Sequence, residues 1–299
     1  MCTAMHIHGL FGRTLDLEYG YGEQPVLCPR DFPLAMRHLP DLPHHHAMLG
    51  MAAVVQGFPL YYDAINEYGL GMAGLHFPHS GQYAPTGEVA SFELIPYVLG
   101  TCTTVEEAKA LLAQVRVCDT PFSPDYPPTK LHWMVADERQ SIVVEPTAEG
   151  LQIYDNPVGV MTNEPPFPRQ LAHWADFAAL TNREPTPTPP HLGRGSGSVG
   201  LPGDFTSPSR FVRAAFVAAH SEEGGDPVAH FFHAIAAVAV PRGCVQLSDD
   251  KQVWSRYTSC MDPVQRMYHY SAYEDRQIHS LTLQKPNGEA LITFPPCGG

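Results

Sequence analysis

The second residue, Cys2, directly follows Met1. A small side chain at this position permits removal of the methionine, after which one residue carries both a thiol and an α-amine. A free α-amine has a pKa of ~7.7 to 8.0 and a free thiol one of about 8.5, so the amine can take the thiol proton near neutral pH. The pairing predicts an N-terminal nucleophile that needs no histidine base. Small residues are common at position 2, so the pattern alone leaves an ordinary cysteine open.

The other cysteines indicate free thiols. The sequence has 7 cysteines, and none is spaced as Cys-x-x-Cys. An odd number without paired spacing argues against a disulfide framework and against a structural zinc site. We expect Cys102, Cys118 and Cys260 to be buried and inert, and Cys297 to be exposed and open to oxidation.

Histidines are the remaining potential metal ligands. His44, His45 and His46 are consecutive, and His38 lies nearby. Consecutive histidines point in different directions, and no aspartate or cysteine lies at a ligand spacing. We therefore predict no metal site and no cofactor.

Composition excludes several classes of protein. Hydrophobic residues make up 44% of the sequence, enough for a large packed core, and 18 basic against 31 acidic residues give a net charge of −13. An acidic chain lacks the field that nucleic acid requires, and no apolar run approaches the roughly 18 residues of a membrane span. The amino end has neither the basic region nor the apolar core of a signal peptide, so we expect a cytoplasmic protein without membrane insertion.

Alternating apolar residues predict strands that position Cys2. Residues 2–7 and 10–17 form a predicted hairpin with a turn at His8-Gly9. Residues 131–136 and 141–145 form a second hairpin, continued by 151–155 and 158–162 as a central antiparallel sheet. Further strands are predicted in 50–55, in 69–75, and in four segments after residue 252.

Helical periodicity falls between these groups of strands. Residues 91–100 suggest one helix, and Thr104 to Glu107 is a predicted capping box that opens a second over 105–117. Three more are predicted over 167–180, 210–220 and 227–240. Runs of helices between runs of strands indicate a layered α+β fold. Residues 181–209, rich in proline and glycine, predict a long irregular loop that is functional or an assembly element.

Several blocks, in order along nearly the whole chain, resemble the choloylglycine hydrolase family, which includes bile salt hydrolases and penicillin V acylases. The resemblance is carried by FGRTLDLEYGYGE, PLYYDAINEYGLGMAGLHFP, LHWMVADERQSIVVE, EGLQIYDNPVGVMTNEP, VGLPGDFTSPSRFVRAAF and RYTSCM. It implies one N-terminal-nucleophile hydrolase domain over residues 1–299 after loss of Met1, folded as a four-layered αββα sandwich with two antiparallel sheets between helical layers. It also implies a bacterial homo-oligomer, a dimer or tetramer, with 181–209 as its projecting assembly segment.

The resemblance assigns five catalytic positions. Cys2 matches the nucleophile, and Arg13 and Asp16 match the arginine and aspartate beside it. Arg13 favours the thiolate, and Asp16 orients the α-amine. Residues three apart on a regular strand point to opposite faces, so both reach Cys2 only if the strand ends or bulges. Asn163 matches an oxyanion donor, and Arg210 pairs with Asp16 or stabilises charge near the thiolate.

One position departs from the family pattern. Where bile salt hydrolases carry asparagine in a Leu-Asn-Phe block, this sequence has Leu75-His76-Phe77. A histidine ring donates to an oxyanion only in the right tautomer or when protonated. His76 is therefore a candidate oxyanion donor, and it bears on substrate preference.

The resemblance also outlines a substrate pocket. Six apolar or aromatic residues match the strand and loops that enclose a sterol, a wall suited to a flat steroid face. They are Leu15, Val55, Phe58, Tyr62, Phe122 and Tyr126.

The function implied is hydrolysis of glycine- or taurine-conjugated bile salts, small-molecule substrates of gut bacteria. Two alternatives stay open at this point. The same site can act on penicillin V or on N-acyl-homoserine lactones, or the fold can serve as an inactive binding protein. The presence of all five catalytic positions disfavours the inactive protein.

Overall fold

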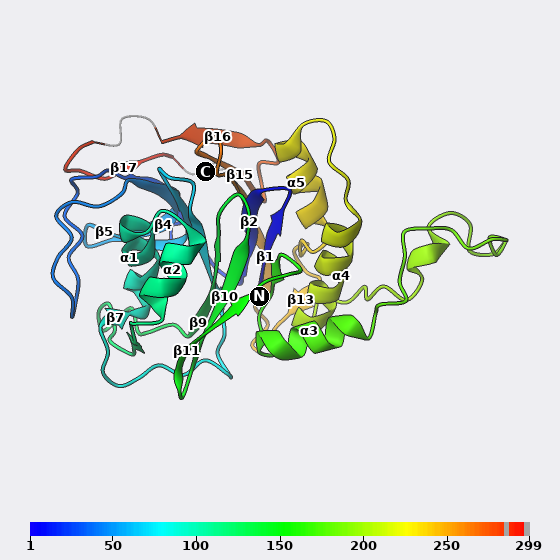
Figure 1. Ribbon diagram of the computed structural model, residues 1–299, viewed down its shortest axis with the longest axis horizontal. Coiled ribbons are helices and arrows are strands. Elements are labelled where there is room, and N and C mark those ends of the chain that lie inside the picture. Colours follow the sequence, from blue (N-terminus) through cyan, green and yellow to red (C-terminus); the bar gives the residue numbers. More distant parts are fainter. Residues whose placement is uncertain (284–286, 296–299) are drawn as a thin grey trace.

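Two large antiparallel sheets pack face to face in the computed structural model, which describes residues 1–283 and 287–295 (Figure 1). The first sheet has the order β12 (Val160–Met161), β1 (Cys2–Ile7), β2 (Leu10–Leu17), β14 (Gln252–Asp262), β15 (Met267–Ala272) and β16 (His279–Thr282), with β13 (Val245–Gln246) beside β14. The second has the order β11 (Gly150–Asp155), β10 (Ser141–Thr147), β9 (Leu131–Ala136), β6 (Gly71–His76), β5 (Phe58–Asn66), β4 (Met48–Val55), β3 (Gln24–Cys28) and β17 (Ile292–Thr293). A short parallel pair joins β7 (Val89–Ala90) and β8 (Val117–Cys118).

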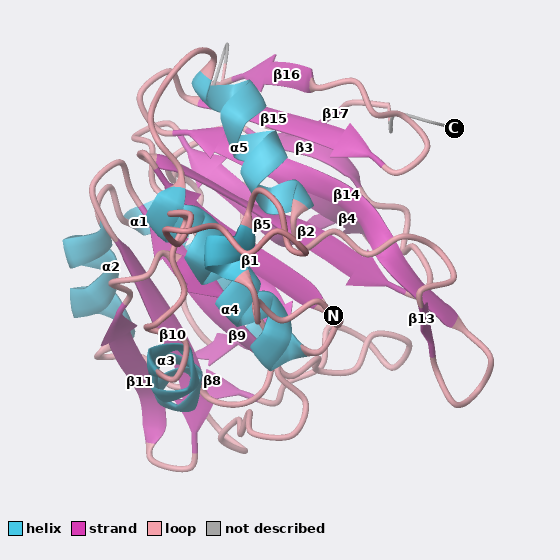
Figure 2. Cartoon of the chain, turned by 90° about the vertical axis from the view of Figure 1, so that its right-hand side faces the viewer, coloured by secondary structure: helices cyan, strands magenta, loops and turns pink. Residues whose placement is uncertain are grey.

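Helices cover both outer faces, which confirms the predicted four-layered αββα sandwich. On the second sheet lie α1 (Leu94–Thr101), which follows a 3₁₀ turn at Ser91–Glu93, and α2 (Val105–Leu112). On the first sheet lie α4 (Ser207–His220) and α5 (Pro227–Ala236), and α3 (Phe167–Ala175) packs against α4 (Figure 2). The apolar faces of these helices supply the outer halves of two hydrophobic cores.

The β1–β2 hairpin is confirmed and sets the geometry of the site. Its turn uses His8 and Gly9 at φ 50° and 75°, the left-handed conformation that tight two-residue hairpins need. The register pairs Cys2 with Leu15 and Ala4 with Arg13. Because side chains alternate along a strand, Cys2 and Arg13 share the face that looks into the space between the sheets.

The helix predictions were wrong at their ends. The structure has helices at 105–112, 167–175 and 227–236 where the sequence predicted 105–117, 167–180 and 227–240, and it starts α4 at 207 instead of 210. The capping box is half formed. Thr104 accepts the N–H of Glu107, but the Glu107 carboxylate reaches the N–H of Thr103 instead of that of Thr104.

Strand predictions were more accurate. The hairpin of β9 and β10 forms as predicted, with β11 beside it. The prediction that 158–162 continues this sheet was wrong, because β12 pairs with β1 in the first sheet. The sequence prediction passed over β5, which fills the space between the two predicted strands β4 and β6. It also passed over β3, the short strand that precedes β4.

Residues 181–206 project from the body between α3 and α4 (Figure 1). Apart from a 3₁₀ turn at Ser196–Ser198 the segment is irregular, as predicted. Its role in assembly stays a prediction. Within the described part of the chain, no helix is both long and apolar enough to cross a lipid bilayer.

Candidate active site

Cys2 begins β1 and is 2% exposed. Met1 continues the strand pairing beyond it: its amino group donates to the Asp16 carbonyl at 2.7 Å, and the Asp16 N–H donates to the Met1 carbonyl at 3.0 Å. Loss of Met1 therefore leaves the Cys2 nitrogen at the end of a strand.

Asn163 holds the nitrogen of Cys2. Its Oδ1 accepts the Cys2 N–H at 2.8 Å and also accepts Nη2 of Arg210 at 2.8 Å. Its Nδ2 donates to the His76 carbonyl at 2.8 Å. The carboxamide therefore joins β1, α4 and the end of β6, three elements far apart in the sequence.

Arg210, in the first turn of α4, is fully buried against the same residue. Its Nη1 donates to the Cys2 carbonyl at 2.5 Å and to Thr3 Oγ1 at 2.6 Å. Burial lowers the pKa of Arg210, while the negative charges of Asp16 and Cys2 oppose that shift. The guanidinium contacts the main chain of Cys2, and both predicted roles of Arg210 stay predictions.

Arg13 and Asp16 lie on opposite faces of β2. Arg13 extends between the sheets, where Nη1 donates to the Gly74 carbonyl at 2.8 Å. The Asp16 carboxylate accepts the hydroxyls of Ser255 at 2.6 Å and of Thr14 at 3.2 Å. A bulge is present, but it lies in β14 between residues 255 and 257, so β2 keeps its alternation.

With Met1 in place the Cys2 nitrogen is an amide that donates to Asn163, and the hydrogen bond from a free α-amine to Asp16 stays a prediction. Asn163 reaches this nitrogen because it directly follows β12, which pairs with β1.

His76 ends β6 at the edge of the site. Its carbonyl accepts from Asn163, and its ring lies near the amino group of Met1. Desolvation and then that positive amino group lower the pKa of the His76 ring, which is therefore neutral at neutral pH. A neutral ring has a single N–H to donate.

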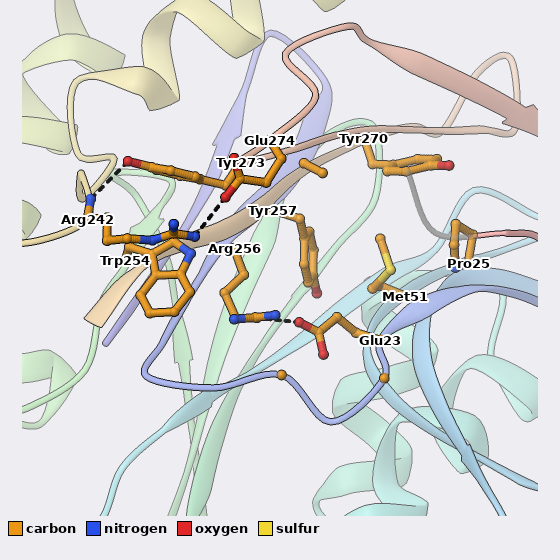
Figure 3. A pocket seen from close by; sticks show the side chains of 13 residues that line it. Glu23, Pro25, Met51, Arg242, Trp254, Arg256, Tyr257, Tyr270, Tyr273 and Glu274 are labelled. Carbon is orange, nitrogen blue, oxygen red and sulfur yellow. Dashed lines mark hydrogen bonds and ion pairs between the residues drawn. The ribbon is translucent and has the colours of Figure 1, made fainter. Parts of the chain in front are cut away.

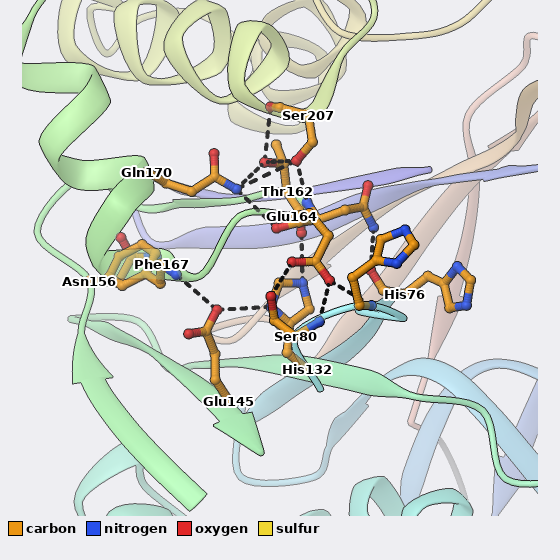
Figure 4. Close-up of polar contacts among 12 residues, drawn as sticks. His76, Ser80, His132, Glu145, Asn156, Thr162, Glu164, Phe167, Gln170 and Ser207 are labelled. Atoms are coloured by element: carbon orange, nitrogen blue, oxygen red, sulfur yellow. Dashed lines mark hydrogen bonds and ion pairs between the residues drawn. The ribbon is translucent and has the colours of Figure 1, made fainter. Parts of the chain in front are cut away.

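A buried polar network supports the backbone that carries Asn163 (Figure 4). The N–H of Asn163 donates to Ser207 Oγ at 2.8 Å, and Gln170 Nε2 donates to the Asn163 carbonyl at 3.0 Å. Gln170 also donates to Thr162 Oγ1 at 2.9 Å, and His132 Nε2 lies 2.8 Å from the Thr162 carbonyl. These contacts fix the position of the carboxamide.

Two carboxylates complete this network (Figure 4). Glu145 accepts the N–H of Phe167 at 2.9 Å and lies 3.2 Å from His132 Nδ1. Glu164 accepts the N–H and the hydroxyl of Ser80 at 2.9 and 2.6 Å. The sequence analysis missed both carboxylates. Only Glu164 had a signal in the sequence, because it lies inside the MTNEP block.

The six predicted substrate residues separate into two groups. Leu15 and Tyr62 belong to the core between the sheets, together with Cys2. The other four lie together in the core under α1 and α2: Val55, Phe58, Phe122 and Tyr126. The Phe58 and Phe122 rings, 5.9 Å apart, are each 8% exposed.

A cavity of about 400 Å³ lies between residues 20–25 and the strands β14 and β15 (Figure 3). Aromatic side chains line it. One of them, Tyr257, also belongs to the core between the sheets. Its two arginines are both paired, Arg242 with Glu274 at 2.7 Å and Arg256 with Glu23 at 2.5 Å. None of the six predicted substrate residues lines it.

Comparisons with known proteins place the chain in a family. The model of the linear amide C–N hydrolases of the choloylglycine hydrolase family matches residues 2–291. A bile salt hydrolase/transferase from Lactiplantibacillus plantarum is 40% identical over 314 residues, 99% of this chain and 97% of that protein. A mutant conjugated bile acid hydrolase from Clostridium perfringens has a similar structure, with a TM-score of 0.93 and 33% identity over 99% of this chain and 97% of that chain.

A more distant structure shares the fold. The penicillin V acylase from Agrobacterium tumefaciens has a TM-score of 0.77 at 22% identity, covering 98% of this chain and 90% of that chain. The match of the family model, the identity to the Lactiplantibacillus plantarum protein and the common fold agree on one assignment. The chain belongs to the choloylglycine hydrolase family and is a linear amide C–N hydrolase.

Proposed function

We propose that this chain hydrolyses the amide bond of glycine- or taurine-conjugated bile salts, with the thiol of Cys2 as the nucleophile. The observation that carries the proposal is the 2.8 Å contact between Asn163 Oδ1 and the Cys2 nitrogen, because that nitrogen becomes the α-amine when Met1 is removed. Arg13 and Arg210, both fully buried, place positive charge around Cys2 and favour its thiolate.

The first half of the reaction forms a thioester. The α-amine takes the thiol proton, and Sγ of Cys2 attacks the amide carbonyl carbon, so that a C–S bond forms and the carbonyl oxygen becomes an oxyanion. When the oxyanion collapses, the C–N bond breaks. The leaving nitrogen of glycine or taurine takes the proton from the α-ammonium group and departs as the free amine.

The second half regenerates the enzyme. A water molecule attacks the thioester carbonyl carbon while the α-amine takes a proton from it. The C–S bond then breaks, the bile acid leaves, and the proton on the α-ammonium group returns to the thiolate. One water is consumed for each amide cleaved.

The oxyanion site yields a prediction at His76. The side-chain oxygen of Asn163 already accepts from Cys2 and Arg210, and one of its N–H groups already donates to the His76 carbonyl. The oxyanion therefore needs a donor besides the remaining N–H of Asn163. If the ring of His76 supplies it, His76→Ala lowers kcat about 100-fold with little change in KM, as for an interaction made mainly in the transition state. His76→Asn keeps or raises activity. A folded His76→Ala protein with the kcat of the wild type would remove this residue from the oxyanion site.

Substrate partition tests the proposed function itself. The relatives named above are a bile salt hydrolase/transferase and a conjugated bile acid hydrolase. Phe58 and Phe122 are each only 8% exposed and lie in a different core from Cys2 and Tyr62, so the expected preference rests on these relatives and not on an open aromatic wall. We therefore expect kcat/KM for conjugated bile salts to exceed kcat/KM for penicillin V, measured as release of glycine, taurine or the β-lactam amine.

The alternative functions predict different results in this assay. A higher kcat/KM for penicillin V, or for an N-acyl-homoserine lactone, than for every conjugated bile salt would contradict the proposed substrate while leaving the family intact. Absence of release from all of these substrates would favour an inactive binding protein. The dimer or tetramer and the cytoplasmic location stay predictions.

A further inference from the structure

Asp63, on β5 of the second sheet, is a fully buried carboxylate that sequence reasoning passed over. Both of its oxygens accept phenol hydroxyls from the opposite sheet. Tyr257 on β14 donates to Oδ2 at 2.5 Å, and Tyr268 on β15 donates to Oδ1 at 2.6 Å. The three side chains form one cluster between the sheets, below the hairpin that carries Cys2.

Arg13 lies beside this cluster but forms no hydrogen bond with the Asp63 carboxylate. Its Nε is 4.0 Å from Oδ2 of Asp63, too long for a hydrogen bond, and donates instead to the Thr14 carbonyl at 3.1 Å. Its Nη2 is buried and finds no acceptor among the residues that the structure describes. Burial acts to lower the pKa of Arg13, but nearby negative groups, Cys2 first among them, raise it above its ordinary value.

The protonation states follow from burial. Burial raises the pKa of both Tyr257 and Tyr268 well above the ordinary value, so both stay neutral phenols and donors. Burial also raises the pKa of Asp63, whereas Arg13 and the two phenols oppose that rise. A carboxylate that accepts a donor on each oxygen fits the ionised form, which has no proton of its own to place.

We propose that Asp63, Tyr257 and Tyr268 are positioning residues that hold Arg13 short of a direct ion pair and so reserve its Nη2 for the Cys2 thiolate. The two phenols occupy the oxygens that would otherwise form a bidentate pair with the guanidinium. The Asp63 charge at the same time limits how strongly Arg13 stabilises the thiolate. The inference rests on the proposed function, because it requires Cys2 to react as a thiolate.

Other titratable groups around Cys2 and Arg13 stay unchanged in the variants that test this. They are Asp16 on β2, Arg210 on α4, His76 at the end of β6, and the amino group at the start of β1. A shift in the pH profile of a cluster variant therefore reports a change in the interaction between Arg13 and Asp63.

The experiment is the pH profile of kcat/KM for a taurine-conjugated bile salt, whose sulfonate does not titrate in the working range. Asp63→Asn removes a negative charge near Arg13, so the acidic limb moves to lower pH by about one unit. Tyr268→Phe frees one oxygen of Asp63 to pair with Arg13, so the acidic limb moves the opposite way, by about half a unit or more. Tyr61→Phe is the matched control. It removes a buried phenol that donates to the Val26 carbonyl at 3.1 Å outside the cluster, and its limb stays in place.

Opposite shifts in the two variants support the inference, and a purely structural role does not produce them. The inference is overturned if the acidic limbs of both variants superimpose on that of the wild type, or if both limbs shift in the same direction. If Asp63→Asn fails to fold because Arg13 loses its counter-charge, the sign for Tyr268→Phe decides. Full activity of Cys2→Ser would instead refute the proposed function, so the two failures are distinguishable.

Discussion

Cys2→Ser is expected to reduce kcat by about a thousandfold or more while the protein stays folded. A serine hydroxyl is far less acidic than a thiol, so an α-amine with a pKa near ~8 activates it poorly. The change replaces sulfur by oxygen in a 2% exposed position, so the loss reflects chemistry and not packing. The measurement is the rate of taurine release, with the melting temperature as a check of folding.

Cys244→Ser is the matched control, because Cys244 is a free thiol that, unlike Cys2, is exposed. It should keep the wild-type rate. A chain in which every cysteine except Cys2 is replaced should also stay active, which separates this mechanism from a papain-like pair that uses an internal cysteine. A normal rate for Cys2→Ser would point to another nucleophile.

Retention of Met1 is expected to abolish turnover. With Met1 in place the Cys2 nitrogen is an amide, bonded to Asn163 as a donor and unable to accept the thiol proton. The methionine also occupies the position next to Asp16, where its amino group donates to the Asp16 carbonyl. A lysine inserted between Met1 and Cys2 blocks removal of the methionine and should leave a folded, inactive chain.

A removable leader provides the rescue. The chain is produced with a leader that a protease cleaves directly before Cys2, and activity should arise only after cleavage, in proportion to the chains that begin with Cys2. Intact-mass analysis measures both populations. Full turnover in chains that still carry the inserted residue would contradict the requirement for a free α-amine.

The sequence predicted the β1–β2 hairpin correctly because its information is local. Alternating apolar residues and the His8-Gly9 turn are enough to define a strand pair and its register. Helix ends were predicted poorly because tertiary contacts decide them. Val115 and Val117 continue the helical spacing of α2, but Val117 belongs to β8, which pairs with β7 and takes the chain out of the helix.

Cys2 was identified from its position after Met1, and Arg13, Asn163 and Arg210 through the family resemblance; the structure brings all four around the start of β1. The groups that hold them could not be found in this way. Asp63 acts only because β5 brings it opposite Tyr257 and Tyr268, which lie 194 and 205 positions later in the chain. Each of these is an ordinary polar residue in its local sequence, and only the packing of the two sheets joins them.

The most direct test of the central claim is capture of the acyl-enzyme. The enzyme is mixed with a conjugated bile salt, quenched in acid during turnover, and measured by intact mass and by peptide mapping. The account predicts one bile acyl group per chain, bound as a thioester to the sulfur of a Cys2 that no longer carries Met1. An acyl group on any other cysteine, or on a chain that retains Met1, would contradict it.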